Sequence, residues 1–426
     1  MNFLKILKFN FFIITPSVEA IGNMGEEIYY SLLKAKRERK KVLILFPYDL
    51  FYPFYFSKYG LGINSELRKI NSKYLLYQCD SWIVFLLNII YTLYLIFKKI
   101  INKILKIIFF QKRNIITVKP KFGINKLWTN NLNVYDSDIV KKMNWHFQFE
   151  NRCDVDLSKK SIQVGRKTKS KMGLPSDCFY VVLHVRDSGY YNAVKGYKEG
   201  KMKSIRNSDI KNYIKSIKYI TDLGWWVVRL GNSKMKKLPK MKNVIDYPFT
   251  QFKSNLMDIF LIKDCNLYFG PRSGIADVAI LFQKNCITTN QFGNILVSNF
   301  KKKDIYIMMK VYSKKLNKIL KLNEVLELYK LNIDFFDEDK FKLIENNEEE
   351  IYQMTKEYFE RKSYLGQTKN QIEWNEKIFQ IGKIIIEKTK NLANDPKINL
   401  LKKYRDASTI YGSKGSISEY FYNKYS

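Results

Sequence analysis

Short apolar runs alternate with amphipathic stretches between residues 179 and 289, and this alternation limits the fold more than any other feature of the chain. The apolar runs have the length of buried strands, and the stretches between them carry apolar residues at helical spacing. Strands are expected at residues 179–185, 225–230, 243–246, 266–269 and 285–289, and helices at 207–223, 254–263 and 275–282. Strands and helices in alternation predict an α/β fold with a doubly wound parallel sheet.

The first part of the chain has a similar but shorter pattern. A strand is expected at residues 10–15, a helix at 26–39 and a second strand at 41–46. The loop before the helix contains Gly22 and Gly25, without the G-x-G-x-x-G spacing of a dinucleotide site. We therefore expect a Rossmann-like domain over residues 1–150, an irregular linker over 151–175, a second Rossmann-like domain over 176–330 and a helical region over 331–426.

Residues 82–110 are strongly apolar and basic. Lys99, Lys103 and Lys106 follow helical spacing, and residues 81–135 contain nine Lys or Arg but no Asp or Glu. This combination favours a helix that lies in a membrane interface and is attracted to anionic lipid. A helix buried between domains and a true membrane span are the alternatives, although the apolar run is short for a span.

The net charge of +34 is spread over the chain rather than gathered in one motif. Of the 74 basic residues 12 are Arg, so 74 − 12 = 62 are Lys, and no nucleic-acid-binding motif accompanies them. We therefore expect no specific nucleic-acid partner. The five cysteines are scattered and form no C-x-x-C pair, which indicates reduced thiols in the cytoplasm.

Anion-binding residues follow three of the predicted strands. His184 and Arg186 end the first strand, and Arg229 with Gly231 ends the second. A later strand leads into residues 270–274, G-P-R-S-G, which open a helix whose free N–H groups favour an anion. Because the carboxyl ends of parallel strands share one edge of a sheet, the sequence predicts a pyrophosphate site there.

Five motifs in this region resemble a poorly characterised bacterial family of GT-B glycosyltransferases. They are H-V-R-D-S-G-Y at 184–190, R-N-x-D-I at 206–210, R-L-G at 229–231, I-D-Y at 245–247 and G-x-x-S-G at 270–274. The H-x-R strand end is also similar to that of GDP-fucose transferases, and the G-x-x-S-G helix start to that of heptosyltransferases. The resemblance covers residues 179–293.

The resemblance implies an acceptor-binding first domain, a donor-binding second domain and a catalytic cleft between them. Arg186 would hold the diphosphate of a nucleotide-sugar donor, with no metal and no further cofactor. The donor-binding residues implied are His184, Arg186, Ser188, Arg229, Gly231, Asp246, Arg272, Ser273 and Gly274. Asn23 occupies the position of an aspartate in heptosyltransferases, so Glu26, Glu27 and Asp187 are the candidate catalytic bases, with Glu19 also considered.

We therefore expect a cytoplasmic glycosyltransferase, peripheral on the inner face of the membrane, that acts on a surface polysaccharide or a lipid-linked glycan. A metal-dependent GT-A enzyme is disfavoured, because the three D-x-D triplets do not follow apolar strands. Two other readings stay open. One is a non-enzymatic protein that binds membranes or polyanions, and the other is a different nucleotide-dependent transferase on the same fold.

Overall fold

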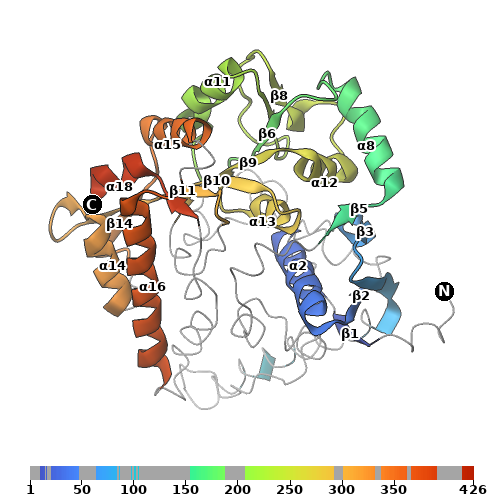
Figure 1. Ribbon diagram of the computed structural model, residues 1–426, viewed down its shortest axis with the longest axis horizontal. Helices are drawn as coiled ribbons and strands as arrows, with labels where there is room; N and C mark the ends of the chain where they lie inside the picture. The colour runs from blue at the N-terminus through green and yellow to red at the C-terminus, as the bar shows by residue number, and fades with distance from the viewer. Residues whose placement is uncertain are drawn as a thin grey trace.

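The computed structural model describes residues 10–14, 16, 21–47, 64–81, 154–187, 207–291, 301–331, 337–361, 366–390 and 415–426, together with a few positions between 82 and 104. These residues form a mixed α/β structure whose largest element is a seven-stranded sheet in which every neighbouring pair is parallel. The α/β prediction is confirmed at this level (Figure 1). The division into two domains stays a prediction.

The large sheet changes direction at its centre. Its strands, in order across the sheet, are β15 (Ser416–Ile417), β11 (Ile305–Met308), β10 (Asn285–Gln291), β9 (Leu267–Pro271), β6 (Tyr180–Leu183), β7 (Trp226–Arg229) and β8 (Val244–Asp246). From β6 the chain adds β7 and β8 on one side, and then returns to place β9 on the other side. The carboxyl ends of β6 and β9 therefore flank a topological switch point, where open α/β sheets bind ligands.

Alternating side chains place the two faces of the large sheet in two apolar cores. Tyr180 and Val182 point into one core, and Val181 and Leu183 into the other. The first core contains residues of α2 (Ile21–Glu38), α12 (Asn255–Asp264) and α13 (Gly274–Leu281). The second contains residues of η4 (Ile210–Tyr213), α11 (Ile214–Asp222), α14 (Leu322–Leu331), α15 (Glu348–Glu360), α16 (Lys369–Lys390) and α18 (Glu419–Tyr425). Helices thus cover both faces, as in a doubly wound sheet.

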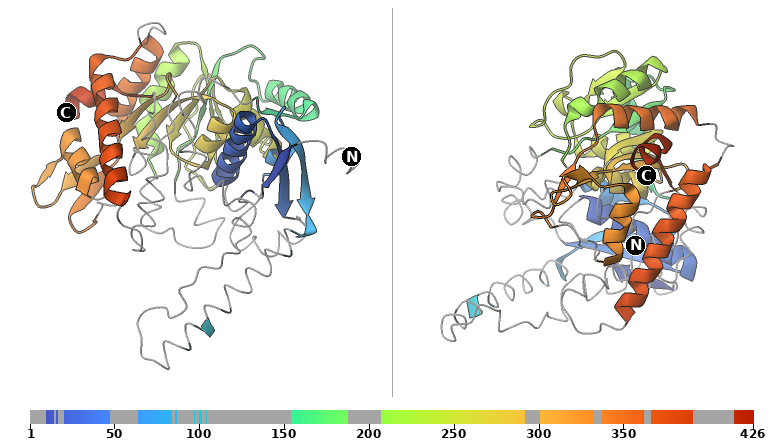
Figure 2. Two further views of the ribbon diagram at one scale, coloured as in Figure 1. Left: turned by 60° about the horizontal axis from the view of Figure 1, so that its bottom comes forward. Right: turned by 90° about the vertical axis from the view of Figure 1, so that its left-hand side faces the viewer.

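The first part of the chain forms a smaller parallel sheet. Its strands are β1 (Phe11–Ile14), β2 (Lys41–Pro47) and β4 (Leu75–Ser81), in the order β1-β2-β4. The predicted strand–helix–strand opening is observed, and its helix begins five residues earlier than expected. The small sheet and α2 lie beside the large sheet (Figure 2), and their apolar residues share its first core.

A helix occupies much of the predicted linker. We expected residues 151–175 to be irregular, but α8 (Lys159–Lys171) runs through them, preceded by β5 (Asp156–Leu157). This helix buries Ser161, Gly165 and Lys169 rather than an apolar stripe. A Cβ on Gly165 would lie 2.2 Å from Phe260, so the glycine lets the backbone pack directly on that ring. The absence of an apolar stripe explains why the sequence pattern did not indicate a helix.

The region after residue 330 also contains strands. A three-stranded antiparallel sheet has the order β13-β12-β14, with β12 (Lys310–Ser313) between β13 (Lys318–Ile319) and β14 (Phe341–Ile344). Residues 331–426 are therefore not only helical, since they supply β14 here and β15 to the large sheet. The remaining short elements are η3 (Ser65–Lys69), β3 (Ile70–Asn71) and η5 (Tyr247–Phe249), and β3 pairs with β5.

Two glycines allow α2 and α13 to touch through their backbones. A Cβ on Gly22 would lie 2.5 Å from Oδ2 of Asp277 and 2.6 Å from Cα of Gly274. A Cβ on Gly274 would lie 2.9 Å from Cγ2 of Ile21. The first turns of the two helices therefore meet, which joins the first part of the chain to the large sheet (Figure 1).

Most of the predicted membrane-contact segment, residues 82–110, lies outside the described residues. In the part of the chain that the structure does describe, no helix has both the length and the apolar character needed to cross a membrane.

The glycine contact predicts opposite effects for two substitutions in α2. Gly22→Ala should lower the free energy of unfolding by about 1–3 kcal/mol, because the added methyl group has no room. In the control Gly25→Ala, the methyl group meets Val278 at an ordinary 3.5 Å, and helix propensity should raise stability by up to about 1 kcal/mol. Denaturant unfolding measures both, and equal effects would contradict the contact.

Candidate functional site

The carboxyl ends of β6 and β9 bring together two of the sequence motifs predicted to bind an anion. Gly270 makes this approach possible, because its φ is +140° and a Cβ would lie 2.1 Å from the carbonyl oxygen of His184. The backbone N–H of His184 donates to the carbonyl oxygen of Phe269, 3.0 Å away. The H-x-R strand end and the G-P-R-S-G loop are thus held side by side at the switch point.

His184 contacts the start of α13 directly. Its Nδ1 lies 3.0 Å from Oγ of Ser273, and Ser273 caps α13 by accepting from the N–H of Ala276. Tyr268 completes the group, since its hydroxyl donates to the carbonyl oxygen of Pro271 at 2.8 Å and lies 3.2 Å from Oγ of Ser273. One serine therefore joins the histidine to a helix N-terminus, which carries partial positive charge.

His184 is uncharged at neutral pH. Its burial, and then the positive charges of Arg186, Arg229 and Lys253, lower its pKa from the ordinary 6.5 to about 3. Three cations therefore lie near enough to affect one ring. The positive charge at this edge comes from arginine, lysine and the helix end, and the histidine contributes a hydrogen-bonding group.

Arg186 is held in place through both its side chain and its backbone. The residue is 9% exposed, and Nη1 donates to Oδ1 of Asn207 at 2.6 Å. The carbonyl oxygen of Arg186 accepts from the N–H of Ser208 at 2.9 Å. We expected a helix from residue 207, but η4 begins only at Ile210 and is capped by Asp209. Residues 207 and 208 instead support the arginine.

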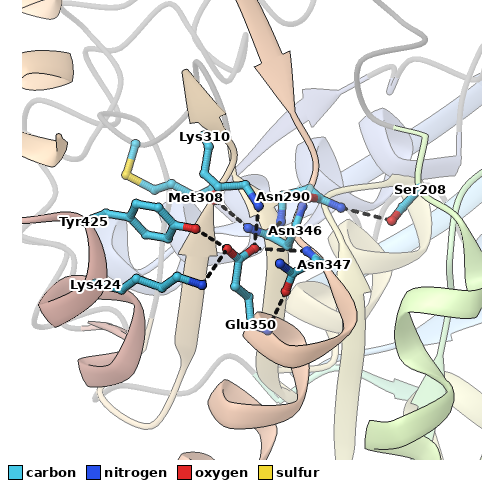
Figure 3. A network of polar contacts seen from close by, with 9 residues as sticks. All are labelled: Ser208, Asn290, Met308, Lys310, Asn346, Asn347, Glu350, Lys424 and Tyr425. Atoms are coloured by element: carbon cyan, nitrogen blue, oxygen red, sulfur yellow. Dashed lines mark hydrogen bonds and ion pairs between the residues drawn. The ribbon is translucent and has the colours of Figure 1, made fainter. Parts of the chain in front are cut away.

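A pair of buried asparagines supports Ser208 in turn (Figure 3). The N–H of Asn290 donates to Oδ1 of Asn346 at 2.6 Å, and the N–H of Asn346 donates to Oδ1 of Asn290 at 2.7 Å. Nδ2 of Asn290 donates to Oγ of Ser208 at 3.1 Å. This reciprocal pair links the end of β10 to the segment that supports Arg186.

Glu350 connects the same network to the end of the sequence (Figure 3). Its carboxylate is fully buried, accepts from Nζ of Lys310 at 2.7 Å and from the hydroxyl of Tyr425, and lies 3.7 Å from Nζ of Lys424. Burial alone would raise the pKa of Glu350, but the hydrogen bonds from Lys310 and Tyr425 lower it below its usual value. The group is therefore a paired, charged carboxylate that ties β12 to α15 and α18.

Arg272 and Gly274 lie at the contact between α13 and α2. Nη2 of Arg272 forms an ion pair with Oδ1 of Asp277 at 3.1 Å, and both side chains are mostly buried. Asp277 also lies against Gly22, so the pair stands beside the first turns of both helices. This placement puts Arg272 next to the first part of the chain as well as next to Ser273.

Arg229 lies inside the protein. It is 1% exposed, and its Nη1 contacts Oδ1 of Asp246 at 3.2 Å and donates to the carbonyl oxygen of Lys236. Gly231 has a φ of +151°, and a Cβ there would lie 2.0 Å from Sδ of Met235. These contacts do not favour a direct contact between these residues and a ligand, and they indicate support of the loop that follows β7.

The predicted catalytic carboxylates are only partly placed. Glu26 and Glu27 lie on α2, near its contact with α13. Glu27 is partly buried, and the side chain of Glu26 is not among those that the structure describes. Asp187 follows Arg186 and is partly buried, whereas Ser188 and Glu19 lie outside the described residues. Among the residues described, no three His, Cys, Asp or Glu side chains are grouped so that they could hold a metal ion.

Sequence reasoning did not assign Tyr268, Asn207 and Asp277 to the site. Asp277 had a readable signal, because an acidic residue in the first turn of a helix is favoured near an N-terminus. Tyr268 reads as an ordinary strand residue, and the bond from Asn207 to Arg186 joins positions 21 residues apart. The residue type at neither position indicates its contact in advance.

Comparison with known proteins finds one weak structural similarity and no related sequence. No protein-family model and no curated protein matches the sequence. Among solved structures, the chain is similar to ADP-heptose LPS heptosyltransferase II of E. coli, with 11% identity and a TM-score of 0.34 over 66% of this chain and 84% of that one. A similarity at this level carries no argument about function.

The uncharged state of His184 predicts a particular dependence of stability on pH. The pKa of His184 is about 3 in the folded protein and 6.5 ordinarily. As the pH falls, His184 is therefore protonated in the unfolded chain before it is protonated in the folded protein. The stabilisation is therefore complete above pH 6.5 and is lost as the pH falls towards 3, by about 1.4 kcal/mol per pH unit while one proton is taken up. His184→Gln should remove this part of the acid dependence.

Ring ¹⁵N resonances provide the direct measurement, because the chain contains only two histidines, His146 and His184. The signal that disappears in His184→Gln should show a neutral ring at pH 5. A midpoint near 6.5 for that signal would contradict the assigned environment.

Proposed function

We propose that this protein is a glycosyltransferase that uses a nucleotide-diphospho-sugar donor. The observation that carries the proposal is the contact between His184 and Ser273 at the switch point, beside Arg186 and the N-terminus of α13. It joins an arginine fork, a capped helix end and an uncharged histidine at the edge where α/β sheets bind nucleotides. The motif resemblance described above gives the same reaction class.

Each group has a distinct task in this proposal. The guanidinium of Arg186, fixed by Asn207, suits the diphosphate because its planar fork matches phosphate oxygens. The N–H groups at the start of α13, with Ser273, Gly274 and Arg272, stabilise the charge that develops on the leaving nucleoside diphosphate. His184 supplies a hydrogen bond to the donor, and we propose that the reaction needs no metal.

The acceptor hydroxyl needs a base for an inverting reaction, and Glu26, Glu27 and Asp187 are the proposed candidates. The contact between α2 and α13 supports the two glutamates, because it brings the first turns of α2 to the helix that would hold the donor phosphates. We propose that the small-sheet part binds the acceptor, in a GT-B arrangement of two Rossmann-like domains. Arg229, Gly231 and Asp246 would act indirectly, by supporting the pocket.

Nucleotide binding tests the donor site. In thermal unfolding with UDP, GDP, CMP, ADP or dTDP, one nucleotide should raise the melting temperature by several degrees, since a ligand at about 100 times its Kd adds roughly 2.7 kcal/mol. Arg186→Ala should abolish this shift without unfolding the protein, and EDTA should leave the wild-type shift unchanged. The matched control is Arg166→Ala, because Arg166 is an exposed arginine of α8.

Weak and equal shifts for all five nucleotides, removed by salt, would contradict the donor site and favour a general polyanion binder. One nucleotide could raise the melting temperature selectively while no sugar is transferred from the matching nucleotide sugar to glycan acceptors. That result would favour another nucleotide-dependent transferase on this fold.

We further propose that the acceptor is a surface polysaccharide or a lipid-linked glycan, reached by peripheral contact with the inner face of the membrane. Exposed apolar side chains between residues 82 and 104 support this location, among them Phe97 (63% exposed), Ile100 (51%) and Ile104 (49%). The coloured piece of this segment lies apart from both sheets in Figure 2. Apolar side chains in an acid-free, basic sequence suit an anionic bilayer.

The triple variant Phe97→Ser, Ile100→Ser and Ile104→Ser should bind phosphatidylglycerol vesicles about tenfold more weakly or worse, because it removes apolar area from the contact. Leu316→Ser with Ile372→Ser is the control, since both residues are exposed elsewhere in the described structure. Co-sedimentation measures both. Equal binding by the triple variant and the wild type would exclude this segment as the contact.

A further inference from the structure

The loop that follows β7, residues 232–243, is densely basic. Five of its twelve residues are lysines, and none is Asp or Glu. All five side chains are exposed; they belong to Lys234, Lys236, Lys237, Lys240 and Lys242. We call residues 232–243 the lysine loop.

A buried ion pair fixes the backbone of the lysine loop. Nη1 of Arg229 donates to the carbonyl oxygen of Lys236 and lies 3.2 Å from Oδ1 of Asp246. Oδ2 of Asp246 accepts from the N–H of Leu238 at 2.8 Å. The pair therefore holds the loop through a carbonyl group and an N–H group two residues apart.

The apolar residues of the lysine loop face inward. Met235 is 6% exposed and fills the space that a side chain at position 231 would need. Leu238 and Met241 pack against the second core. These contacts fix the backbone of the loop, so the lysines project from one ordered segment despite their mutual repulsion.

The lysines have little internal compensation. Lys236 pairs with the partly buried Asp209 at a long 3.9 Å, and Lys237 lies over the ring of Phe249 at 5.1 Å. Within the described residues, the other lysines of the loop form no ion pair. Their positive charge is therefore available to an external partner.

The lysine loop adjoins the candidate site. It begins two residues after Leu230, whose N–H donates to the carbonyl oxygen of Leu183 at 2.7 Å, at the end of the strand that leads into His184. The first part of the loop, through Leu238, therefore lies at the edge that holds the anion-binding groups, where Lys236 and Leu238 bond to Arg229 and Asp246. Its last lysines, Lys240 and Lys242, lead back to the start of β8 at the opposite edge.

We propose that the lysine loop binds the phosphate groups of a polyanionic glycan, which is the acceptor of the transfer reaction. This inference rests on the proposed function, and it specifies the acceptor class. Lysine point charges spread over a fixed loop suit a repeating phosphate chain, which releases counterions when it binds. The loop has no exposed aromatic or large aliphatic side chain to insert into lipid, so its chemistry favours an aqueous polymer over a bilayer.

The test compares two variants that each lose five positive charges. In the loop variant, Lys234, Lys236, Lys237, Lys240 and Lys242 are replaced by Gln. In the control, the exposed lysines Lys302, Lys303, Lys314, Lys315 and Lys321 are replaced by Gln. Binding of labelled inorganic polyphosphate near physiological salt is measured by fluorescence anisotropy, beside the nucleotide shift and phosphatidylglycerol vesicle binding.

The loop variant should bind polyphosphate about tenfold more weakly or worse, since five exposed ion pairs are lost, and the control should change about twofold at most. Both should keep the circular dichroism spectrum and the nucleotide shift of the wild type. Equal weakening in the two variants, or loss of vesicle binding with intact polyphosphate binding in the loop variant, would overturn the proposal. If the wild type binds polyphosphate but no nucleotide, the result contradicts the proposed glycosyl transfer and leaves phosphate binding by the lysine loop intact.

Discussion

The pairing of β6 with β9 is the constraint on which the rest of the site depends. These strands are neighbours in space but are separated in sequence by β7, β8 and α12, so their pairing creates the switch point. It also requires glycine at position 270, because the backbone of β9 passes directly beside the carbonyl oxygen of His184. The histidine, the cap of α13 and Arg186 occupy one edge because this pairing places them there. The polar network from Asn290 to Glu350 (Figure 3) reaches this edge through Ser208, whose N–H donates to the carbonyl oxygen of Arg186.

Buried charge in this protein serves to position backbone rather than to provide binding energy directly. The pair of Arg229 and Asp246 has lost most of its contact with water, which costs free energy that its mutual attraction only partly returns. Its value lies in two further hydrogen bonds, to Lys236 and Leu238, which fix a loop that has no regular secondary structure. Glu350 has the same role in the later part of the chain, where it ties β12 to α15 and α18. In both cases a charged group connects segments that apolar packing alone would leave adjustable.

The sequence predicts the parallel sheet well because the evidence for each strand is local. A buried strand such as β6 is an apolar run between polar turns, and α13 begins at a serine cap that can be read directly. Contacts between distant residues are a different matter. Arg229 looks like a ligand-binding arginine until Asp246, 17 residues later, is seen beside it. The helix α8 is not predicted because its packing face consists of Ser161, Gly165 and Lys169, and only the ring of Phe260 opposite explains why that face is buried. The tether between Asn207 and Arg186 is likewise visible only in three dimensions.

The last described segment has a consequence for how the protein acquires its structure during synthesis. Strand β15 pairs with β11, and Ile417 and Phe421 are almost completely buried in the second core. These residues leave the ribosome after the rest of the described sheet and after the helices α11, α14, α15 and α16 of the second core. Among the residues that the structure describes, the first core contains none later in sequence than Cys286, so this core can form while translation continues. One face of the large sheet must therefore remain without its full apolar cover until residues 416–422 emerge, and the nascent chain is most exposed to aggregation and chaperone binding during that interval.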